Sequence, residues 1–464
     1  MTRGKQYLFV FLITFLSTLL VFNVKTLLLP FIFVFIIFFF LLSDNLFEST
    51  FLTFLLALPF ENAIRQWLIY ADQNNINGYS LYFGITLKII FGLLLLLLFL
   101  LPKNRTLLKI TPHSKNTTIL LCFIILTTIT SLFFQNRISN VFLGYVSLIL
   151  AALYFFSASI FFSLPDKKHI FAEFIVALTI FCSFFGLVQL IKQSPTGRYI
   201  ELTPSFAKTT GYTTTDGKPQ YRVAGFISHP VYFGSFLSIL IPIIIGLFFE
   251  KRQLIYLPLI IISIIVLLGT LSRSTWINLT VMFLLFYYYQ KTHSLHLPPV
   301  KFPKIIIKFV IPLSIIIVLS LVIPLILTRV GSIPELLNNK NGSIYTRVNL
   351  AVVSLKITQS YPLTGIGLNS FTLKNHSAPP HNTFLIFLVE LGIPATLLFI
   401  TFIIRSLIPR SKPNSFQPLT FGVWVGLLTF IISSQIHPLF NLDPTFDLFM
   451  LVLGFYATCQ PSRT

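Results

Sequence analysis

Long apolar runs occupy most of this sequence and leave few ways for it to fold. A helix needs about 20 residues to cross the ~30 Å hydrocarbon core of a bilayer, and runs of roughly that length recur between short polar segments. Of the 464 residues, 55% are hydrophobic and only 10% are charged. Because a soluble domain cannot keep so much apolar side chain away from water, the sequence predicts an integral membrane protein made of helices.

The predicted fold is all-α and polytopic, with about fourteen membrane spans. Three of the runs, 46–60, 275–290 and 446–459, are short enough to be re-entrant or merged, so that the count falls to about twelve. The full set is 7–23, 27–43, 46–60, 80–101, 118–134, 140–163, 170–191, 229–249, 254–271, 275–290, 305–327, 384–404, 417–433 and 446–459.

Basic residues in the short loops predict how the chain is oriented. They cluster in loops that fall on one side when the spans are threaded in turn, and this side is expected to be cytoplasmic, together with both termini. The formal net charge of +20 therefore fits an anionic membrane surface, and we expect no nucleic-acid partner. The longer polar loops lie on the opposite side, so we expect the site to be extracytoplasmic: 61–79, 192–228, 328–383 and 434–443.

The largest of these loops contains a segment with helical periodicity. Within 343–360, apolar residues recur at 345, 348, 352 and 355, interrupted by Arg347 and Lys356, which is typical of a helix lying on the membrane surface. The Tyr-Pro pair at 361–362 is expected to end it. We divide the chain into N-terminal transmembrane helices, 1–191, and a loop-rich transmembrane region, 192–464.

Arg273 stands between two apolar runs with almost no loop around it. A guanidinium keeps its proton, and at membrane depth it is costly unless it reaches the interface, meets an anion or faces water. Two interpretations stay open: a snorkelling arginine or an anion-binding residue. The neighbouring Ser272, Ser274 and Thr275 would add hydroxyl donors and cap the next helix, which suits a phosphate.

Arg222 and His229 precede another long apolar run, in the sequence YRVAGFISHPVYFG. Arg222 lies in a loop with other basic residues, so a solvated cation is one interpretation. The other is that Arg222 joins Arg273 on a single diphosphate, because planar guanidinium groups bind phosphate oxygens in pairs. A His-Pro turn at a helix start is ordinary, so His229 is expected to be structural.

His381 and Asn382 follow a Pro-Pro pair at the start of an apolar helix. A helix N-terminus disfavours imidazolium and keeps the ring neutral, which is the state that a general base requires. A packing or capping histidine is the alternative. Glu390 comes nine residues later, on the opposite face and more than two turns deeper, so it is expected to be a buried carboxylate with an intramembrane partner.

Metal and nucleotide chemistry find little support in the sequence. It shows no metal-ligand spacing, no phosphate-binding loop and no Ser/His/Asp arrangement, and the acidic residues of the outer loops are scattered singly. We therefore expect a metal-free site without a cofactor.

Five short motifs follow one another in the C-terminal half: RVAGFISHP at 222–230, SRSTW at 272–276, RVNLA at 347–351, PLTGIGL at 362–368 and HNTFLIFLVELG at 381–392. In order and spacing they resemble the O-antigen ligase and O-antigen polymerase superfamily of membrane enzymes. The resemblance covers roughly residues 220–430. One departure is Val231, because the family often has Asn after the His-Pro pair.

This resemblance implies a helical membrane fold of the GT-C type in the inner membrane. It implies transfer of a glycan from an undecaprenyl-diphosphate donor to a hydroxyl of a glycan, lipid or protein acceptor during surface-polysaccharide assembly, including that of lipopolysaccharide. Arg222 and Arg273 would stabilise the leaving diphosphate, and His381 would take the acceptor proton. The residues expected to support them are Ser272, His229, Arg347, Asn382 and Glu390. Ligase, polymerase and protein O-oligosaccharyltransferase remain alternatives.

A transporter or flippase of lipid-linked glycans is the alternative from a different class. Alternating access needs polar groups near the membrane midplane and usually repeated halves. The polar residues here gather on one face instead, with Lys88 and Glu173 as the midspan candidates. The pattern therefore favours an enzyme.

Overall fold

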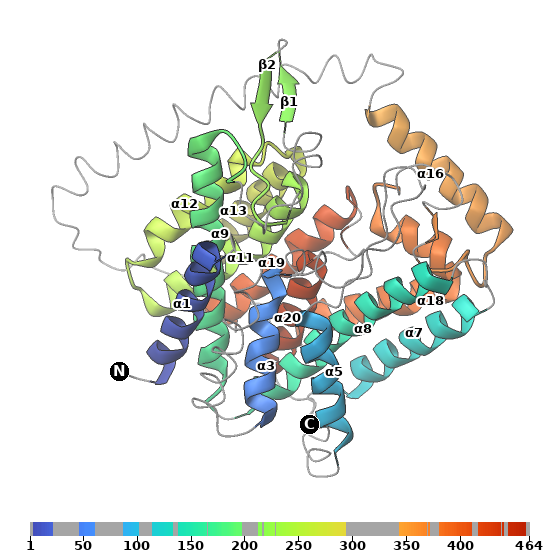
Figure 1. The fold of residues 1–464 in the computed structure, drawn as a ribbon, viewed down its shortest axis with the longest axis horizontal. Helices are drawn as coiled ribbons and strands as arrows, with labels where there is room; N and C mark the ends of the chain where they lie inside the picture. Colours follow the sequence, from blue (N-terminus) through green and yellow to red (C-terminus); the bar gives the residue numbers. More distant parts are fainter. Residues whose placement is uncertain are drawn as a thin grey trace. The chain divides into compact units, whose positions relative to one another are not determined.

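The structure is a computed structural model. It describes residues 3–21, 46–60, 87–101, 114–132, 138–164, 166–196, 212–215, 218–227, 229–293, 343–368, 370–371, 380–410, 416–437, 439 and 444–460. These residues are helical apart from their turns and one short antiparallel hairpin (Figure 1). The helical membrane fold expected from the sequence is therefore confirmed for the described part of the chain.

The helices are α1 (Arg3–Val21), α3 (Leu46–Ala57), the 3-10 helix η2 (Leu58–Phe60), α5 (Leu87–Leu100), α7 (Ser114–Leu132), α8 (Ile138–Phe161), α9 (Lys168–Lys192), α11 (Pro230–Lys251), α12 (Tyr256–Gly269), α13 (Arg273–His293), α16 (Ser343–Ser360), α18 (Thr383–Leu407), α19 (Pro418–Ser434) and α20 (Pro444–Cys459). The hairpin pairs β1 (Tyr212–Thr215) with β2 (Lys218–Tyr221). Predicted spans and helices coincide wherever the structure describes the chain; the runs at 27–43 and 305–327 lie outside the described residues.

Four helices of the described part are long and apolar enough to cross a membrane. They are Gly144–Phe161 within α8, then α9, α11 and α18. Shorter apolar helices accompany them, including α12, α19 and α20. Together with the composition, these helices establish a membrane protein of many apolar helices.

The chain forms two compact units that interleave along the sequence. The first contains residues 1–174, 347–411 and 434–464, and the second contains 175–346 and 412–433. These units are defined by packing. The predicted division after residue 191 separates the N-terminal helices from the loop-rich region, and it remains a prediction.

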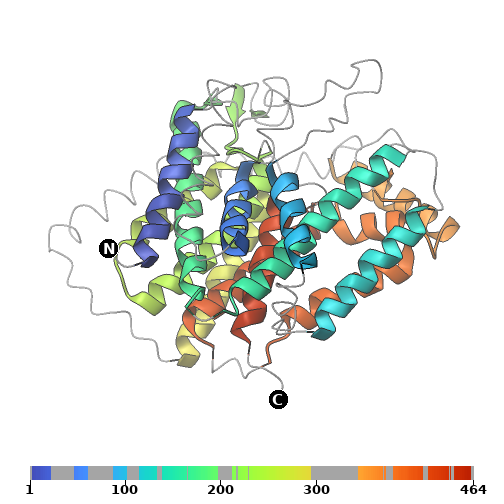
Figure 2. The same cartoon turned by 60° about the horizontal axis from the view of Figure 1, so that its bottom comes forward.

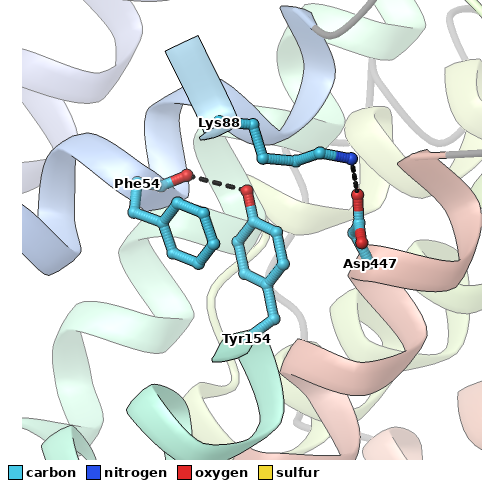
Figure 3. Close-up of polar contacts among 4 residues, drawn as sticks. All are labelled: Phe54, Lys88, Tyr154 and Asp447. Atoms are coloured by element: carbon cyan, nitrogen blue, oxygen red, sulfur yellow. Dashed lines mark hydrogen bonds and ion pairs between the residues drawn. The ribbon is translucent and has the colours of Figure 1, made fainter. Parts of the chain in front are cut away.

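In the first unit, α20 packs along α8. The first turn of α20 contains Asp447, which forms a buried ion pair. The Lys88 Nζ of α5 lies 2.5 Å from the Asp447 Oδ2, with both side chains almost fully buried (Figure 3). Beside it the Tyr154 hydroxyl donates to the carbonyl of Phe54 at 2.9 Å, and the two rings stack. Each charge thus has its partner inside the apolar core, as burial of charge requires.

A second helix pair in this unit is formed by α7 and α18, which lie side by side in Figures 1 and 2. Phe123 of α7 contacts Phe387 and Phe399 of α18, with ring centroids 6.2 and 5.1 Å apart. The other edge of each helix exposes aliphatic side chains, among them Ile125 and Leu397. This is the surface expected of helices that face lipid.

In the second unit, α11 packs against α12 and α13, and it meets α19 at close range. Gly422 and Gly426 of α19 lie so near α11 that an added Cβ would stand 2.3 Å from the carbonyl oxygen of Pro242 and 2.6 Å from that of Ile239. Small residues four apart let membrane helices approach in this way. The Thr429 hydroxyl adds a 2.8 Å bond to the carbonyl of Ser238.

Candidate functional site

The turn between α12 and α13 carries the first group of predicted site residues. Leu271 has φ +50, a left-handed conformation that turns the chain sharply before α13 begins at Arg273. The carbonyl of Ser272 accepts from the backbone N–H groups of Thr275 and Trp276, which starts the helix. Arg273 is thereby held half-buried at the first position of α13.

The hydroxyls around Arg273 are engaged within this turn. Those of Ser272 and Ser274 lie 2.9 Å apart, and the Thr275 hydroxyl donates to the carbonyl of Ser272 at 2.7 Å. All three side chains are buried. They cap and fix the turn, so the anion-binding hypothesis rests on the guanidinium groups rather than on these hydroxyls.

Arg222 lies at the same turn. Directly after β2, its Nε donates to the carbonyl of Thr270 at 3.0 Å, three residues before Arg273. The next residue, Val223, donates its N–H to the carbonyl of Gly269 at 3.0 Å. Arg222 and Arg273 therefore both lie beside the turn that follows α12, and their joint binding of one anion remains a prediction.

A buried glutamine that the motifs do not mark holds the segment after Arg222. The Gln189 Oε1 of α9 accepts from the N–H groups of Ala224 and Gly225 at 3.1 and 2.8 Å, and its Nε2 donates to the carbonyl of Gly225 at 3.0 Å. Gly225 has φ +58. The sequence offers little signal for this role, because Gln189 lies in the last turns of an apolar run.

His229 caps α11, as its position before Pro230 predicts. Its Nδ1 accepts from the backbone N–H of Val231 at 3.3 Å, and its backbone is extended. The ring also packs against Tyr232. This geometry supports a structural role for His229.

The second group of site residues lies at the start of α18, in the first unit. Asn382 is the N-cap residue, because its side-chain oxygen accepts from the N–H of Leu385 at 3.1 Å. Its Nδ2 donates to the carbonyl of Gln435 at 3.1 Å. His381 precedes this cap and is half-buried at the mouth of the helix.

The surroundings of His381 favour the neutral form of its imidazole. Burial lowers the pKa of His381 below its usual value, and the positive charge of Arg347 on α16 lowers it further. Its Nδ1 is buried and has no hydrogen-bond partner among the described residues. A neutral ring can accept a proton at pH 7, so the electrostatics fit the role of general base.

The placement of Arg347 depends on a break in α18. Gly392 has φ +77 and ψ 175, and Pro394 follows without an N–H, so this helix loses its own hydrogen bonds there. The loop after α16 takes them over: Ile366 and Gly367 donate to the carbonyls of Val389 and Glu390, each at 2.9 Å. In return Ile393 donates to the carbonyl of Pro362 at 2.8 Å.

The two glycines of this contact are required sterically. A Cβ on Gly365 (φ +64) would lie 2.4 Å from the backbone of Glu390, and one on Gly392 would lie 2.6 Å from that of Leu363. Leu350 of α16 also packs in a buried cluster with Ile366 and Phe371 and with Val389 of α18. Loop and broken helix thus fix α16 in place.

Glu390 is buried, as the sequence predicts for a carboxylate inside the helix. Its Oε1 accepts from the backbone N–H of Phe371 at 3.1 Å. It holds the loop against α18 and lies more than two turns from His381. This contact supports a structural role for Glu390.

His437 is a histidine beside His381 that the motifs miss. Its ring is perpendicular to that of His381, with the centroids 6.1 Å apart. The only sequence signal is its position in a short polar loop, 434–443, expected on the outer face. Among the described residues, no three His, Cys, Asp or Glu side chains gather as a metal site requires.

Apolar helices with polar residues at the turns and caps between them are typical of a polytopic membrane protein. Residues 258–400 match the family model of O-antigen ligase, so this segment of the chain is similar to that family. No curated protein matches the chain.

The matched segment confirms the resemblance drawn from the motifs. It contains Arg273, Arg347, His381 and Glu390, and it lies within the predicted region 192–464. Three other residues, Arg222, His229 and His437, lie outside it. His381 and the two predicted arginines belong to different compact units, so their convergence on one substrate stays a prediction.

Proposed function

We propose that this membrane enzyme transfers a glycan from an undecaprenyl-diphosphate donor to an acceptor hydroxyl on the extracytoplasmic side, as an O-antigen ligase does. The observation that carries the proposal is the place of His381, a half-buried imidazole at the mouth of α18 whose pKa is lowered by burial and by Arg347. The O-antigen ligase match over residues 258–400 supports the reaction class.

The reaction needs two things from the protein. The acceptor hydroxyl must lose its proton as it attacks the anomeric carbon, and neutral His381 takes that proton. The bond from that carbon to the diphosphate breaks, and Arg222 and Arg273 stabilise the charge that develops on the leaving group. Single displacement would invert the anomeric configuration. No step requires a metal or cofactor.

Helix α16 supports a site at the level of the membrane surface. Val348, Val352 and Leu355 form an apolar stripe on its exposed side, each about half exposed at helical spacing, beside exposed Asn349 and Lys356, whereas the opposite side is buried. The apolar stripe continues through exposed Leu363 to Ile393 on α18. We propose that α16 lies in the outer leaflet, which keeps Arg347 and His381 at the depth of lipid head groups.

The transporter alternative loses one of its two supports. Lys88, a midspan candidate for a translocation path, is held in the core by Asp447. A buried lysine that is paired with a carboxylate on a neighbouring helix is typical of a structural ion pair. Polymerase and protein O-oligosaccharyltransferase activities use the same chemistry and differ in the acceptor.

Transfer of a labelled glycan from purified lipid-linked donor, in detergent or proteoliposomes, tests the proposal. We expect His381→Ala to abolish transfer while donor binding persists. Undiminished transfer in that variant would contradict the role of His381.

The anion-binding role has its own test. We expect Arg273→Lys to weaken donor use by roughly tenfold or more, because lysine cannot form a paired contact with phosphate oxygens. The control is Arg405→Lys, at an exposed position in the last turn of α18. Equal activity of the two variants would favour a snorkelling role for Arg273.

A further inference from the structure

The segment that carries His437 is bound to the start of α18. The Thr383 hydroxyl donates to the carbonyl of His437 at 3.0 Å and accepts from the N–H of Leu439 at 3.1 Å. The side chain of Asn382 donates to the carbonyl of Gln435 at 3.1 Å. The segment containing Gln435, His437 and Leu439 is thus hydrogen-bonded to Asn382 and Thr383, the two residues that follow His381.

These bonds place the two imidazole rings in contact. His437 is 7% exposed, and its ring meets that of His381 at 88° with 6.1 Å between the centroids. Edge-to-face packing at this distance is a favoured arrangement of aromatic rings. The charged group that acts on His381 from α16 is Arg347.

A histidine that acts as a base needs its ring held in one orientation. In most such sites a carboxylate or carbonyl does this by accepting a hydrogen bond from the second ring nitrogen. The Nδ1 of His381 is buried and has no such partner among the described residues. Packing against another ring is therefore the contact that the structure offers for fixing the imidazole.

We propose that His437 is a positioning residue for His381, acting through the packing of its ring rather than by exchanging protons. The proposal rests on the proposed role of His381 as the base. It gives the short loop between α19 and α20, which lies outside the segment that matches O-antigen ligase, a part in the reaction.

The test compares His437→Ala with His437→Phe in the full-length protein, using glycan transfer from purified lipid-linked donor. A base displaced by about 1 Å can lose roughly a hundredfold in rate, so we expect the Ala variant to lower kcat about ten- to hundredfold, with KM for the donor within about twofold. The Phe variant restores a ring face, so we expect it to recover most of kcat.

A matched control and a second pair of variants separate this role from folding. His169 also packs its ring against an aromatic residue, Tyr7, and is exposed, so His169→Ala should leave transfer unchanged. If His437→Ala does not fold, the transfer rate of His437→Phe is compared with that of His437→Leu, because leucine fills space without a ring face. We expect the Phe variant to be the more active.

Three outcomes would overturn one idea each. Normal kcat in His437→Ala, with His381→Ala inactive, overturns the positioning role alone. A folded Phe variant as slow as the Ala or Leu variant shows that ring nitrogens are needed and overturns positioning by packing. Full transfer in His381→Ala overturns the proposed function itself.

Discussion

Replacing Gly392 by Ala tests how the broken helix α18 holds the loop beside it. Gly392 has φ +77 and ψ 175, a combination that is essentially restricted to glycine. An added Cβ would stand 2.6 Å from the carbonyl carbon and oxygen of Leu363. Because both obstacles are backbone, the loop has to move away from the helix.

The cost follows from two terms. A residue with a side chain adopts this backbone conformation only at a cost of about 1–3 kcal/mol. Displacing the loop endangers the backbone bonds donated by Ile366, Gly367 and Ile393, at about 1 kcal/mol each. If all three bonds are lost, the contact should therefore be weakened by about 4–6 kcal/mol, and every 1.4 kcal/mol is about a tenfold change in an equilibrium constant.

Hydrogen exchange measures this weakening locally. We expect the amides of Ile366, Gly367 and Ile393 to exchange roughly a thousandfold faster or more in Gly392→Ala, up to the limit that the global stability sets. The control is Ile393→Ala, which changes an exposed side chain at the same kink and keeps its N–H. Exchange less than about tenfold faster than in the control would refute the reasoning.

Three further predictions concern other contacts. Arg347→Gln removes a positive charge that lowers the pKa of His381, so the acidic limb of the profile of kcat/KM against pH should move to higher pH; an unmoved or opposite limb contradicts the coupling. Lys88→Met should destabilise the protein by about 3–5 kcal/mol in thermal unfolding, whereas exchanging Lys88 and Asp447 together for apolar residues should recover most of the loss; equal losses would show that the pair is not the cause. Gly422→Ala should cost about 1–3 kcal/mol by forcing α19 from α11, and an unchanged melting temperature would show that the helices can separate freely.

Apolar length predicts the helices because a membrane imposes one requirement on every span. Each must satisfy its backbone internally over about 20 residues, so hydropathy alone locates elements such as α9 and α11. Helix α16 follows equally well, since its bounds, Ser343–Ser360, agree with the apolar periodicity in that loop. The local sequence pattern is therefore sufficient to predict helices, because their hydrogen bonds join residues that are close in the sequence.

The contacts of the site are less visible because they join distant segments. Asn382 and His229 are predictable as residues at helix starts, since capping is a matter of neighbours in sequence. Gln189 binds a turn 36 residues away, and His437 meets a ring 56 residues away. No periodicity relates such pairs, so the sequence marks the polar residues but not their partners.

The break in α18 shows how these two kinds of information combine. Gly392 and Pro394 deprive the carbonyls of Val389 and Glu390 of helical partners, which a sequence can show. Buried carbonyls need donors, and the glycine-containing loop after α16 supplies them through the N–H groups of Ile366 and Gly367. The hydrogen bonds at the break therefore hold the loop that follows α16, the helix that carries Arg347. The charge of Arg347 in turn lowers the pKa of His381. The electrostatics of the base thus depend on a backbone defect more than two turns away from it.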